Sequence, residues 1–410
     1  MPITRFGQWF MLALVIGCGR ADRPAGPVDP PAAAEQPALP IQPPAPVPPP
    51  GPVPVAQDQP GPAGTQDIPL AEDEYPLALS PGATTVAVRG RGNAGVELRD
   101  VATGKVRQRV PVIEFGNPEQ GTFTADGKQL ALAAGWAGVT LVDTATGRHI
   151  LLETIPGGHV GAVAFAADGK TLAAGSDIRV RRWALSGDTP RQLEPDFNLR
   201  DRVGALAYHP DGTKLAAGAG TALALLDVAT GQEAWRVPAH SGHVTSIAFS
   251  PDGGRIVTAA RGVDTTVRVW AAADGKAVAS LPHPAIAIAA FYSADGGTIL
   301  TATADGFLHA WDAAAGTRIA SRRWRQPDSY MLDTGRIAPD RSAVLLSRLT
   351  TSKLFRAAAL TSGAVKAANE PLPPSPDRPT PYLPVRLTLT DLKDGPSAIH
   401  FAAIVAGSSE

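Results

Sequence analysis

The sequence predicts an all-β protein made of seven copies of one repeat, and two turn signals support this prediction. The first is an Asp-Gly pair in five copies, at successive steps of 42, 43, 41 and 43 residues. The second is an Asp-x-Ala-Thr-Gly turn in the same phase, at residues 100–104, 143–147 and 227–231. Two independent turns at one period indicate a repeat of about 40 to 45 residues with four strands in each copy. The Asp-Gly pairs begin at Asp126, Asp168, Asp211, Asp252 and Asp295.

The best-preserved copy, residues 242–270, indicates how one repeat folds. Residues 244–250 alternate apolar with small or polar side chains, which is the period of a half-buried strand. A Pro-Asp-Gly turn follows, in which proline presets φ, aspartate bonds nearby backbone and glycine accepts positive φ. Two more strands are expected at 255–259 and 266–270. A sheet of this size cannot bury its own faces, so the copies must stack on one another.

Both ends of the array contain weaker copies. Pro81-Gly82 fits one step before the first Asp-Gly pair, and Pro339-Asp340 fits one step after the last. The total is therefore seven copies.

Several residues in these copies resemble the WD-repeat β-propellers. Gly-His pairs open two copies at residues 158–159 and 242–243, a Ser-Pro-Asp-Gly turn follows the second pair, and a tryptophan closes the third strand at Trp183, Trp270 and Trp311. The resemblance implies a seven-bladed β-propeller of four-stranded antiparallel blades, spanning residues 67–370.

The same resemblance implies a hydrogen-bonded structural tetrad of histidine, serine or threonine, aspartate and tryptophan within one blade. It maps best onto His243, Thr258, Asp264 and Trp270. His159 is given the same structural role in its own copy. These side chains are therefore expected to brace a blade rather than to bind a ligand.

The closure of the ring is left open by the sequence. Propellers of this family often pair an N-terminal strand into the last blade, and residues 68–71 could do this. Alternatively, residues 364–368 could supply the outer strand of the seventh blade. Residues 371–384 read as a second Pro-rich linker, and residues 385–410 as two further strands that brace the ring or add a partial blade.

The N-terminal region predicts export and anchoring. Residues 1–17 contain a short apolar run typical of a signal peptide, and residues 14–18 resemble the lipobox of bacterial lipoproteins. Cys18, the single cysteine, is then the lipidated residue; the alternative is a free or buried cysteine behind a cleaved signal. Residues 18–66 are rich in proline and alanine and predict a disordered tether. We expect a lipid-anchored protein at the periplasmic or extracytoplasmic face of the cell envelope.

Composition and motifs argue against several functions. A formal net charge of −1 is not that of a basic nucleic-acid binder. No phosphate-binding loop, zinc-protease motif or nucleophile elbow is present, so no cofactor, metal or catalytic residue is expected. The pair His240 and His243 has a metal-like spacing, but His243 is better explained by the tetrad. The repeated aspartates fall in equivalent turns of different blades and are read as turn formers.

Binding is therefore the expected function, and departures from the repeat are the candidate sites. Trp136 falls in the turn between the second and third strands of its copy, where it either anchors a partner or folds over a neighbouring blade. The cluster Arg322, Arg323, Trp324 and Arg325 interrupts the outer strand of the sixth copy. It either binds an acidic partner or an anionic envelope polymer, or protects a solvated edge from aggregation.

The sequence thus favours a non-catalytic protein-binding scaffold displayed by a lipid anchor. Its protein partner is unidentified. The alternatives are a propeller hydrolase or lactonase with its site at the central channel, and an outer-membrane assembly factor. A hydrolase predicts polar or metal-ligating side chains on the innermost strands, whereas these strands offer mainly small apolar ones.

Overall fold

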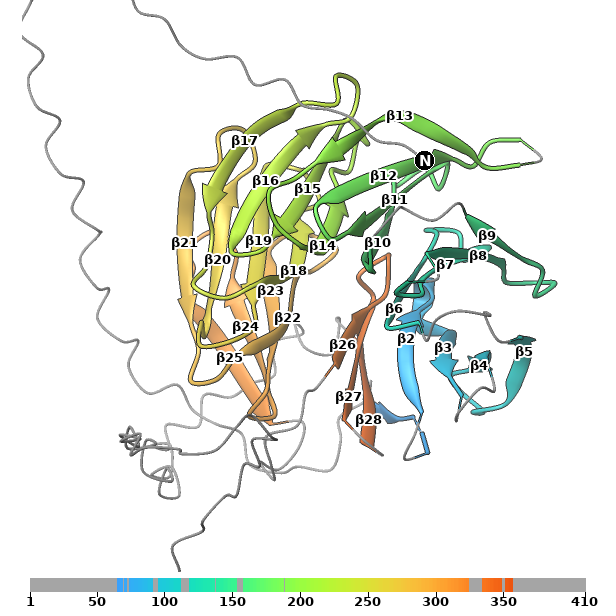
Figure 1. Cartoon of the computed structure of the whole chain (residues 1–410). Coiled ribbons are helices and arrows are strands. Elements are labelled where there is room, and N and C mark those ends of the chain that lie inside the picture. The colour runs from blue at the N-terminus through green and yellow to red at the C-terminus, as the bar shows by residue number, and fades with distance from the viewer. Residues whose placement is uncertain are drawn as a thin grey trace, which may run out of the picture. The chain divides into compact units, whose positions relative to one another are not determined.

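The computed structural model describes residues 65–68, 70–71, 74–90, 95–111, 118–136, 138–152, 158–187, 189–323, 334–348 and 351–356. Within these residues, twenty-eight strands form seven antiparallel sheets of four strands each (Figure 1). The prediction of a seven-bladed β-propeller is therefore confirmed. Among the described residues, no helix is long and apolar enough to cross a membrane.

The strands follow the repeat in chain order, from the inner to the outer strand of each blade. Blade 1 contains β2 (Tyr75–Leu79), the short 3-10 turn η1 (Pro81–Ala83), β3 (Thr85–Arg89), β4 (Val96–Asp100) and β5 (Val106–Val110). Blade 2 contains β6 (Gln120–Phe123), β7 (Gln129–Ala133), β8 (Val139–Asp143) and β9 (His149–Leu152). Blade 3 contains β10 (Val160–Phe165), β11 (Thr171–Ser176), β12 (Arg179–Ala184) and β13 (Arg191–Asn198).

The remaining blades repeat this order. Blade 4 contains β14 (Val203–Tyr208), β15 (Lys214–Ala219), β16 (Ala222–Asp227) and β17 (Glu233–Pro238). Blade 5 contains β18 (Val244–Phe249), β19 (Arg255–Ala260), β20 (Thr266–Ala271) and β21 (Ala277–Pro282). Blade 6 contains β22 (Ala287–Tyr292), β23 (Thr298–Thr303), β24 (Phe307–Asp312) and β25 (Arg318–Arg323). Blade 7 contains β26 (Thr334–Ile337), β27 (Ala343–Arg348), β28 (Thr351–Arg356) and β1 (Thr65–Asp67).

An N-terminal strand closes the ring. β1 pairs with β28 in the register Thr65 to Phe355 and Asp67 to Lys353, so the start of the propeller supplies the outer strand of blade 7. Of the two closures that the sequence allowed, this is the N-terminal one. The strand covers residues 65–67, and of the expected residues 68–71 Ile68 continues the pairing, with its N–H donating to the carbonyl oxygen of Ser352 at 2.9 Å. β2 also contacts β26, which brings blades 1 and 7 together. Residues 364–368, 371–384 and 385–410 lie outside the described residues.

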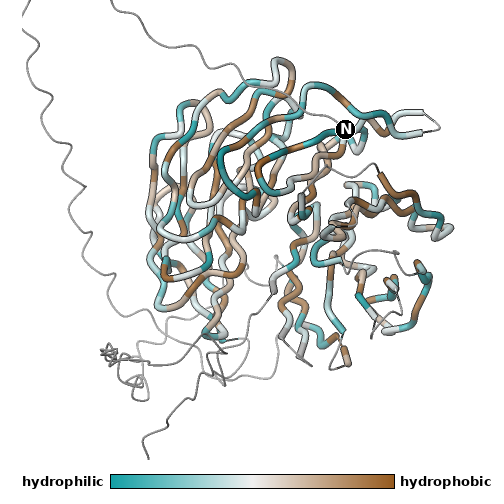
Figure 2. Tube along the Cα trace, in the orientation of Figure 1, coloured by the Kyte–Doolittle hydropathy of each residue, from teal (hydrophilic) through white to brown (hydrophobic). Residues whose placement is uncertain are grey.

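The hydrophobic core lies between the blades, where apolar segments run along the strands (Figure 2). Val180 and Phe197 of blade 3, for example, pack with Val203 and Leu215 of blade 4. Burying each such side chain stabilises the fold by about 1.5–3 kcal/mol. The second strands are rich in alanine and glycine because the next blade lies close against them: a Cβ at Gly175 would overlap the side chain of Val203.

The Asp-Gly turns have the structure that the sequence predicts. In blade 5, Asp252 Oδ1 accepts two hydrogen bonds. One comes from Ser250 Oγ at 2.5 Å and the other from the N–H of Gly254 at 3.0 Å. Gly253 has a φ of 74°, which only glycine adopts without strain. The hydrogen bonds from Ser250 and Gly254 lower the pKa of Asp252. Blade 6 repeats this turn with Ser293 and Asp295, so these carboxylates hold separate turns.

Candidate partner-binding face

A chain of buried hydrogen bonds braces blade 5. Trp270 Nε1 donates to Thr258 Oγ1 at 2.9 Å, and that oxygen lies 2.8 Å from Nε2 of His240. The other ring nitrogen, Nδ1 of His240, lies 3.1 Å from Oδ2 of Asp264. Burial raises the pKa of Asp264, but hydrogen bonds from Arg268 and from backbone N–H groups outweigh it and lower the pKa overall. The side chains that form these hydrogen bonds stabilise the blade and are buried away from any ligand.

The histidine in this hydrogen-bonded tetrad is His240, so the assignment of His243 to the tetrad is wrong. His243 is exposed and stands directly before β18, where its side chain cannot reach Thr258. The bend of residues 239–243 instead turns His240 back into the sheet. A signal for this was present in the sequence: His240 and His283 are 43 residues apart, the same step as that between Asp252 and Asp295.

Blade 6 contains a variant of the same arrangement. His283 Nε2 lies 2.7 Å from Thr301 Oγ1, and Trp311 Nε1 donates to the same oxygen at 3.1 Å. A second buried imidazole, His309, lies with its ring centroid 5.1 Å from that of His283. Burial lowers the pKa of His283 to about 4, and burial together with the neighbouring His283 lowers the pKa of His309 to about 2. Both imidazoles are therefore neutral at pH 7.

Two sets of connections lie at the same end of the blades: the turns between second and third strands, and the links from an outer strand to the next inner strand. We call this end the upper face. Trp136 lies on it, in the turn between β7 and β8, with 68% of its surface exposed. Its indole packs edge-on against the imidazole of His159, with ring centroids 5.6 Å apart.

His159 has a different role from the one that the sequence predicts. Its Nε2 lies 3.5 Å from Oε1 of Glu119, and its Nδ1 lies 3.1 Å from Nη2 of Arg202. It therefore joins blades 2, 3 and 4 at the upper face instead of completing a tetrad within blade 3. We refer to Glu119, Trp136, His159 and Arg202 as the Trp136 cluster.

The upper face also carries other exposed apolar side chains. Ile178, in the turn between β11 and β12, is 49% exposed, and Val263, in the turn between β19 and β20, is 86% exposed. At the opposite end, several connections are tight turns held by an aspartate carboxylate, as where the N–H and Oγ1 of Thr230 both donate to Oδ1 of Asp227. Trp136, Ile178 and Val263 thus expose apolar surface at the upper face, which makes it the candidate face for a partner.

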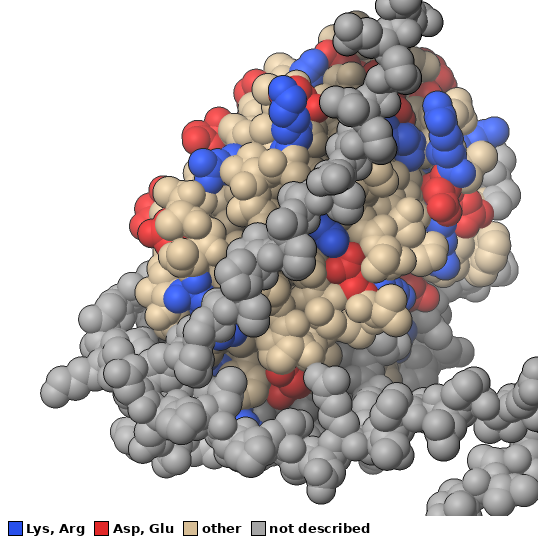
Figure 3. All heavy atoms as spheres, turned by 90° about the vertical axis from the view of Figure 1, so that its left-hand side faces the viewer, with Lys and Arg blue, Asp and Glu red and all other residues tan. Residues whose placement is uncertain are grey.

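The basic cluster is only partly described. Arg322 and Arg323 belong to β25, where they pair with Leu308 and Phe307, so the outer strand continues through them and is not interrupted. The guanidinium of Arg323 lies 4.8 Å from the ring centroid of Phe307, and burial lowers the pKa of Arg322. Trp324 and Arg325 lie outside the described residues. On the face shown in Figure 3, basic and acidic side chains are interspersed.

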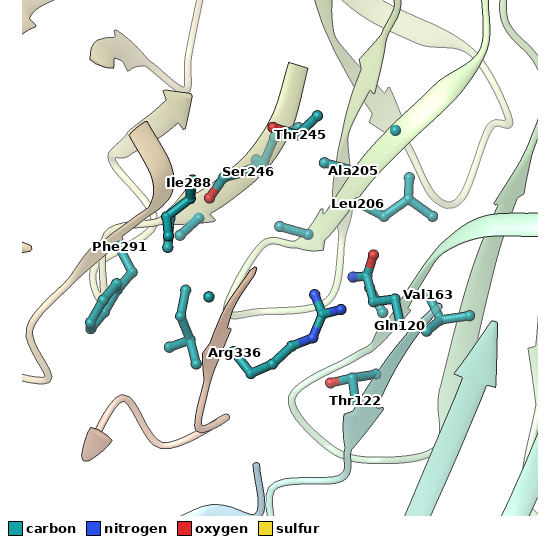
Figure 4. Close-up of a pocket in the computed structure, with 18 of the residues that line it drawn as sticks. Gln120, Thr122, Val163, Ala205, Leu206, Thr245, Ser246, Ile288, Phe291 and Arg336 are labelled. Atoms are coloured by element: carbon teal, nitrogen blue, oxygen red, sulfur yellow. The ribbon is translucent and has the colours of Figure 1, made fainter. Parts of the chain in front are cut away.

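The inner strands enclose a central channel with a volume of about 1450 Å³. Most of its wall is alanine, glycine and other apolar residues, as the sequence of the inner strands indicates. Polar and charged residues also line it: Glu119, Gln120, Thr122, Tyr208, Thr245, Ser246, Arg261, Thr265, Asp305, Arg336 and Arg341. Figure 4 shows the guanidinium of Arg336 reaching toward Gln120 and Thr122. The described residues contain no group of three or more side chains suited to a metal ion.

These features define a seven-bladed propeller with a candidate partner-binding face, and comparisons with known proteins agree with the propeller fold. The family model "WD domain, G-beta repeat" matches residues 151–184 and 231–271. An uncharacterised WD repeat-containing protein of Synechocystis sp. is 28% identical over 161 residues, which cover 39% of this chain and 33% of that relative. These two matches support the WD-repeat family.

The fold also resembles a solved structure. A chain in the crystal structure of a mitotic checkpoint complex has a TM-score of 0.61 and 18% sequence identity, over 73% of this chain and 95% of that chain. At this identity, the likeness concerns the fold. A propeller of this kind is consistent with a scaffold for protein interactions.

Proposed function

We propose that this protein is a non-catalytic protein-binding scaffold whose partner docks on the upper face at the Trp136 cluster. One observation carries the proposal: Trp136 is 68% exposed, yet its ring has a defined position against His159. Tryptophan is among the residues that most often dominate the energy of a protein interface. A large aromatic surface held in place loses little conformational entropy when a partner covers it.

The neighbours of Trp136 fit this role. Glu119 and Arg202 place opposite charges on the two sides of His159, and the side chain of Glu119 is 60% exposed. An apolar anchor with a polar rim is the usual anatomy of a protein interface, in which the rim charges select the partner. We expect the partner to present an apolar pocket for the indole, flanked by groups that complement these charges.

A non-catalytic role is supported by the chemistry of the inner strands. The channel wall is mainly apolar, and its hydroxyl groups are not paired with a histidine. Ser321 and His309 do form a Ser–His pair at 2.7 Å, but they are 6% and 3% exposed, so no substrate reaches them. A nucleophile must be accessible from the site where substrate binds.

We further propose that the propeller is displayed at the extracytoplasmic face of the cell envelope. Here Cys18 carries the lipid, residues 1–17 are removed, and residues 18–66 hold the propeller away from the membrane. This part of the proposal rests on the sequence, because these residues, except 65 and 66, lie outside the described part of the chain. Replacing Cys18 with serine should move the protein from the membrane to the soluble fraction; unchanged membrane partition would refute the anchor.

Affinity capture from envelope extract tests the docking face. The tagged protein should recover a stable partner, and Trp136→Ala should reduce that recovery at least tenfold. Leu151→Ala is the matched control, because Leu151 is 53% exposed on the outer strand of the same blade. Equal recovery by the two variants would overturn the proposed docking face. Turnover of esters or lactones by the purified protein would overturn the non-catalytic role.

A further inference from the structure

Arg336 places a cation in the central channel. It belongs to β26, the inner strand of blade 7, and its side chain crosses the inner strand of blade 1. Its Nε donates to the carbonyl oxygen of Pro76 at 3.1 Å, and its Nη2 donates to that of Glu119 at 2.7 Å. Two of its five N–H donors are therefore used, and the guanidinium plane is fixed by backbone groups of blades 1 and 2.

No carboxylate of the described residues forms a direct ion pair with Arg336, although that of Glu119 acts on it at longer range and raises its pKa. The nearby carboxylate of Glu119 pairs instead with His159, at 3.5 Å. Removal from water lowers the pKa of Arg336 to about 10, which still leaves the group protonated at pH 7. The half-buried guanidinium makes its direct hydrogen bonds only to neutral carbonyl groups, so an anion placed beside its remaining N–H groups would offset the cost of its burial.

The surroundings indicate the kind of anion. The channel is larger than the roughly 300–1,000 Å³ of typical small-molecule sites, with a volume of about 1450 Å³. Gly121, Gly161, Gly204 and Gly335 are among the residues of its wall, so part of the wall is backbone rather than side chains. Gln120 and Thr122 lie on the side toward which the guanidinium reaches (Figure 4). This is room for an extended peptide with apolar side chains and hydrogen-bonding groups.

We propose that the central channel binds a peptide segment through a carboxylate, which the free N–H groups of Arg336 receive in a bidentate pair. The planar guanidinium matches the two oxygens of a carboxylate, and its fixed position lowers the entropy lost on binding. The carboxylate comes from a chain end or from an acidic side chain. This site is separate from the indole surface of Trp136 and does not depend on it.

A purely structural role for Arg336 makes a different prediction, and a second arginine provides the comparison. Arg341, after β26, also lines the channel, and its Nη2 donates to the carbonyl oxygen of Phe249 in blade 5 at 2.9 Å. Both arginines thus tie blade 7 to a blade two positions away. If tying blades is all that Arg336 does, its replacement and that of Arg341 should have the same consequences.

Isothermal titration of the whole protein at pH 7.5 and constant ionic strength tests the site. The probes are N-acetyl-Ala-Leu-Ala-Leu with a free carboxylate, its C-terminal amide, and the amide of N-acetyl-Ala-Asp-Ala-Leu. The free acid should bind the wild type at least tenfold more tightly than its amide. The aspartate peptide distinguishes the sources: binding like the free acid assigns an acidic side chain, and binding like the amide assigns a chain end.

Four variants complete the test. Arg336→Gln should abolish the difference between acid and amide, and Arg336→Lys should retain part of it. Arg341→Gln and Trp136→Ala should leave it unchanged. Equal or absent binding of acid and amide by the wild type would overturn the proposal, and so would a preference that survives in Arg336→Gln. If Arg336→Gln does not fold, the wild-type preference and the partial loss in Arg336→Lys decide.

Discussion

Blades 5 and 2 use tryptophan in opposite ways. Trp270 closes the third strand of blade 5, is 5% exposed and donates to Thr258. Blade 2 has Val142 at the corresponding end of β8, and its tryptophan, Trp136, lies one turn earlier with 68% of its surface exposed. The preserved repeat thus builds the fold, whereas the divergent one frees an aromatic ring for a partner. The same residue type is structural or functional according to its place in the repeat.

Replacing each tryptophan with alanine should separate the two roles, with the largest effect at Trp270. Trp270→Ala should lower the free energy of unfolding by about 3–5 kcal/mol, because it opens a cavity and leaves Thr258 without its donor. Trp136→Ala should change it by no more than about 0.5 kcal/mol, as is usual for exposed sites. Urea unfolding monitored by circular dichroism measures both values, and equal losses would contradict the comparison.

The two histidines before β18 should also differ in their contribution to stability, the buried one contributing more than the exposed one. His240→Ala removes a buried partner of Thr258 and Asp264 and should cost about 1–3 kcal/mol of stability. His243→Ala removes an exposed side chain and should stay within about 0.5 kcal/mol. The same unfolding measurement checks both. A larger loss in His243→Ala than in His240→Ala would restore the assignment made from the sequence.

The buried imidazoles of blade 6 should make stability depend on pH. The folded pKa of His283 is about 4 and that of an unfolded histidine is about 6.5, so between these values the unfolded chain binds more protons. Stability should therefore fall as the pH drops below about 6.5, by up to about 1.4 kcal/mol per pH unit for each such histidine.

A variant isolates this contribution. His309→Gln removes one of the two imidazoles, so its unfolding free energy should fall less steeply than that of the wild type between pH 6.5 and pH 4.5. The turn aspartates do not interfere in this window, because hydrogen bonds lower the pKa of Asp252 and Asp295 below 3.8. Identical slopes for the two proteins would show that His309 is not held neutral by the fold.

The sequence predicted the fold well because the turns that define it are local. An Asp-Gly pair forms its turn from its own hydrogen bonds, so its phase reveals five blades without knowledge of the packing. The Pro81-Gly82 and Pro339-Asp340 pairs, one step before and one step after, add the other two. Ring closure was less predictable: Ile68 and Leu70 carry the apolar pattern because they pack between blades 7 and 1, while the strand pairing lies in the polar residues Thr65 to Asp67.

The sites depended on contacts that cross between blades, and these were predicted less well. The place of Trp136 in a turn followed from the sequence, but its contact with His159 joins two blades. Arg336 was missed because its environment is created by carbonyl groups of blades 1 and 2, far away in the chain. His240 was missed because its neighbour, His243, matched the family pattern more closely. In each case the residue contacts groups that lie outside its own turn, and a local sequence pattern does not reveal such contacts.

The most direct test of the docking face is photo-crosslinking in native cells. A photoreactive p-benzoylphenylalanine replaces either Trp136 on the upper face or Leu151 on the outer strand, with both proteins produced at the wild-type level. Position 136 should yield a discrete crosslinked protein that is absent at position 151. The same product at both positions, or a product at position 151 alone, would contradict a partner that docks on the Trp136 cluster.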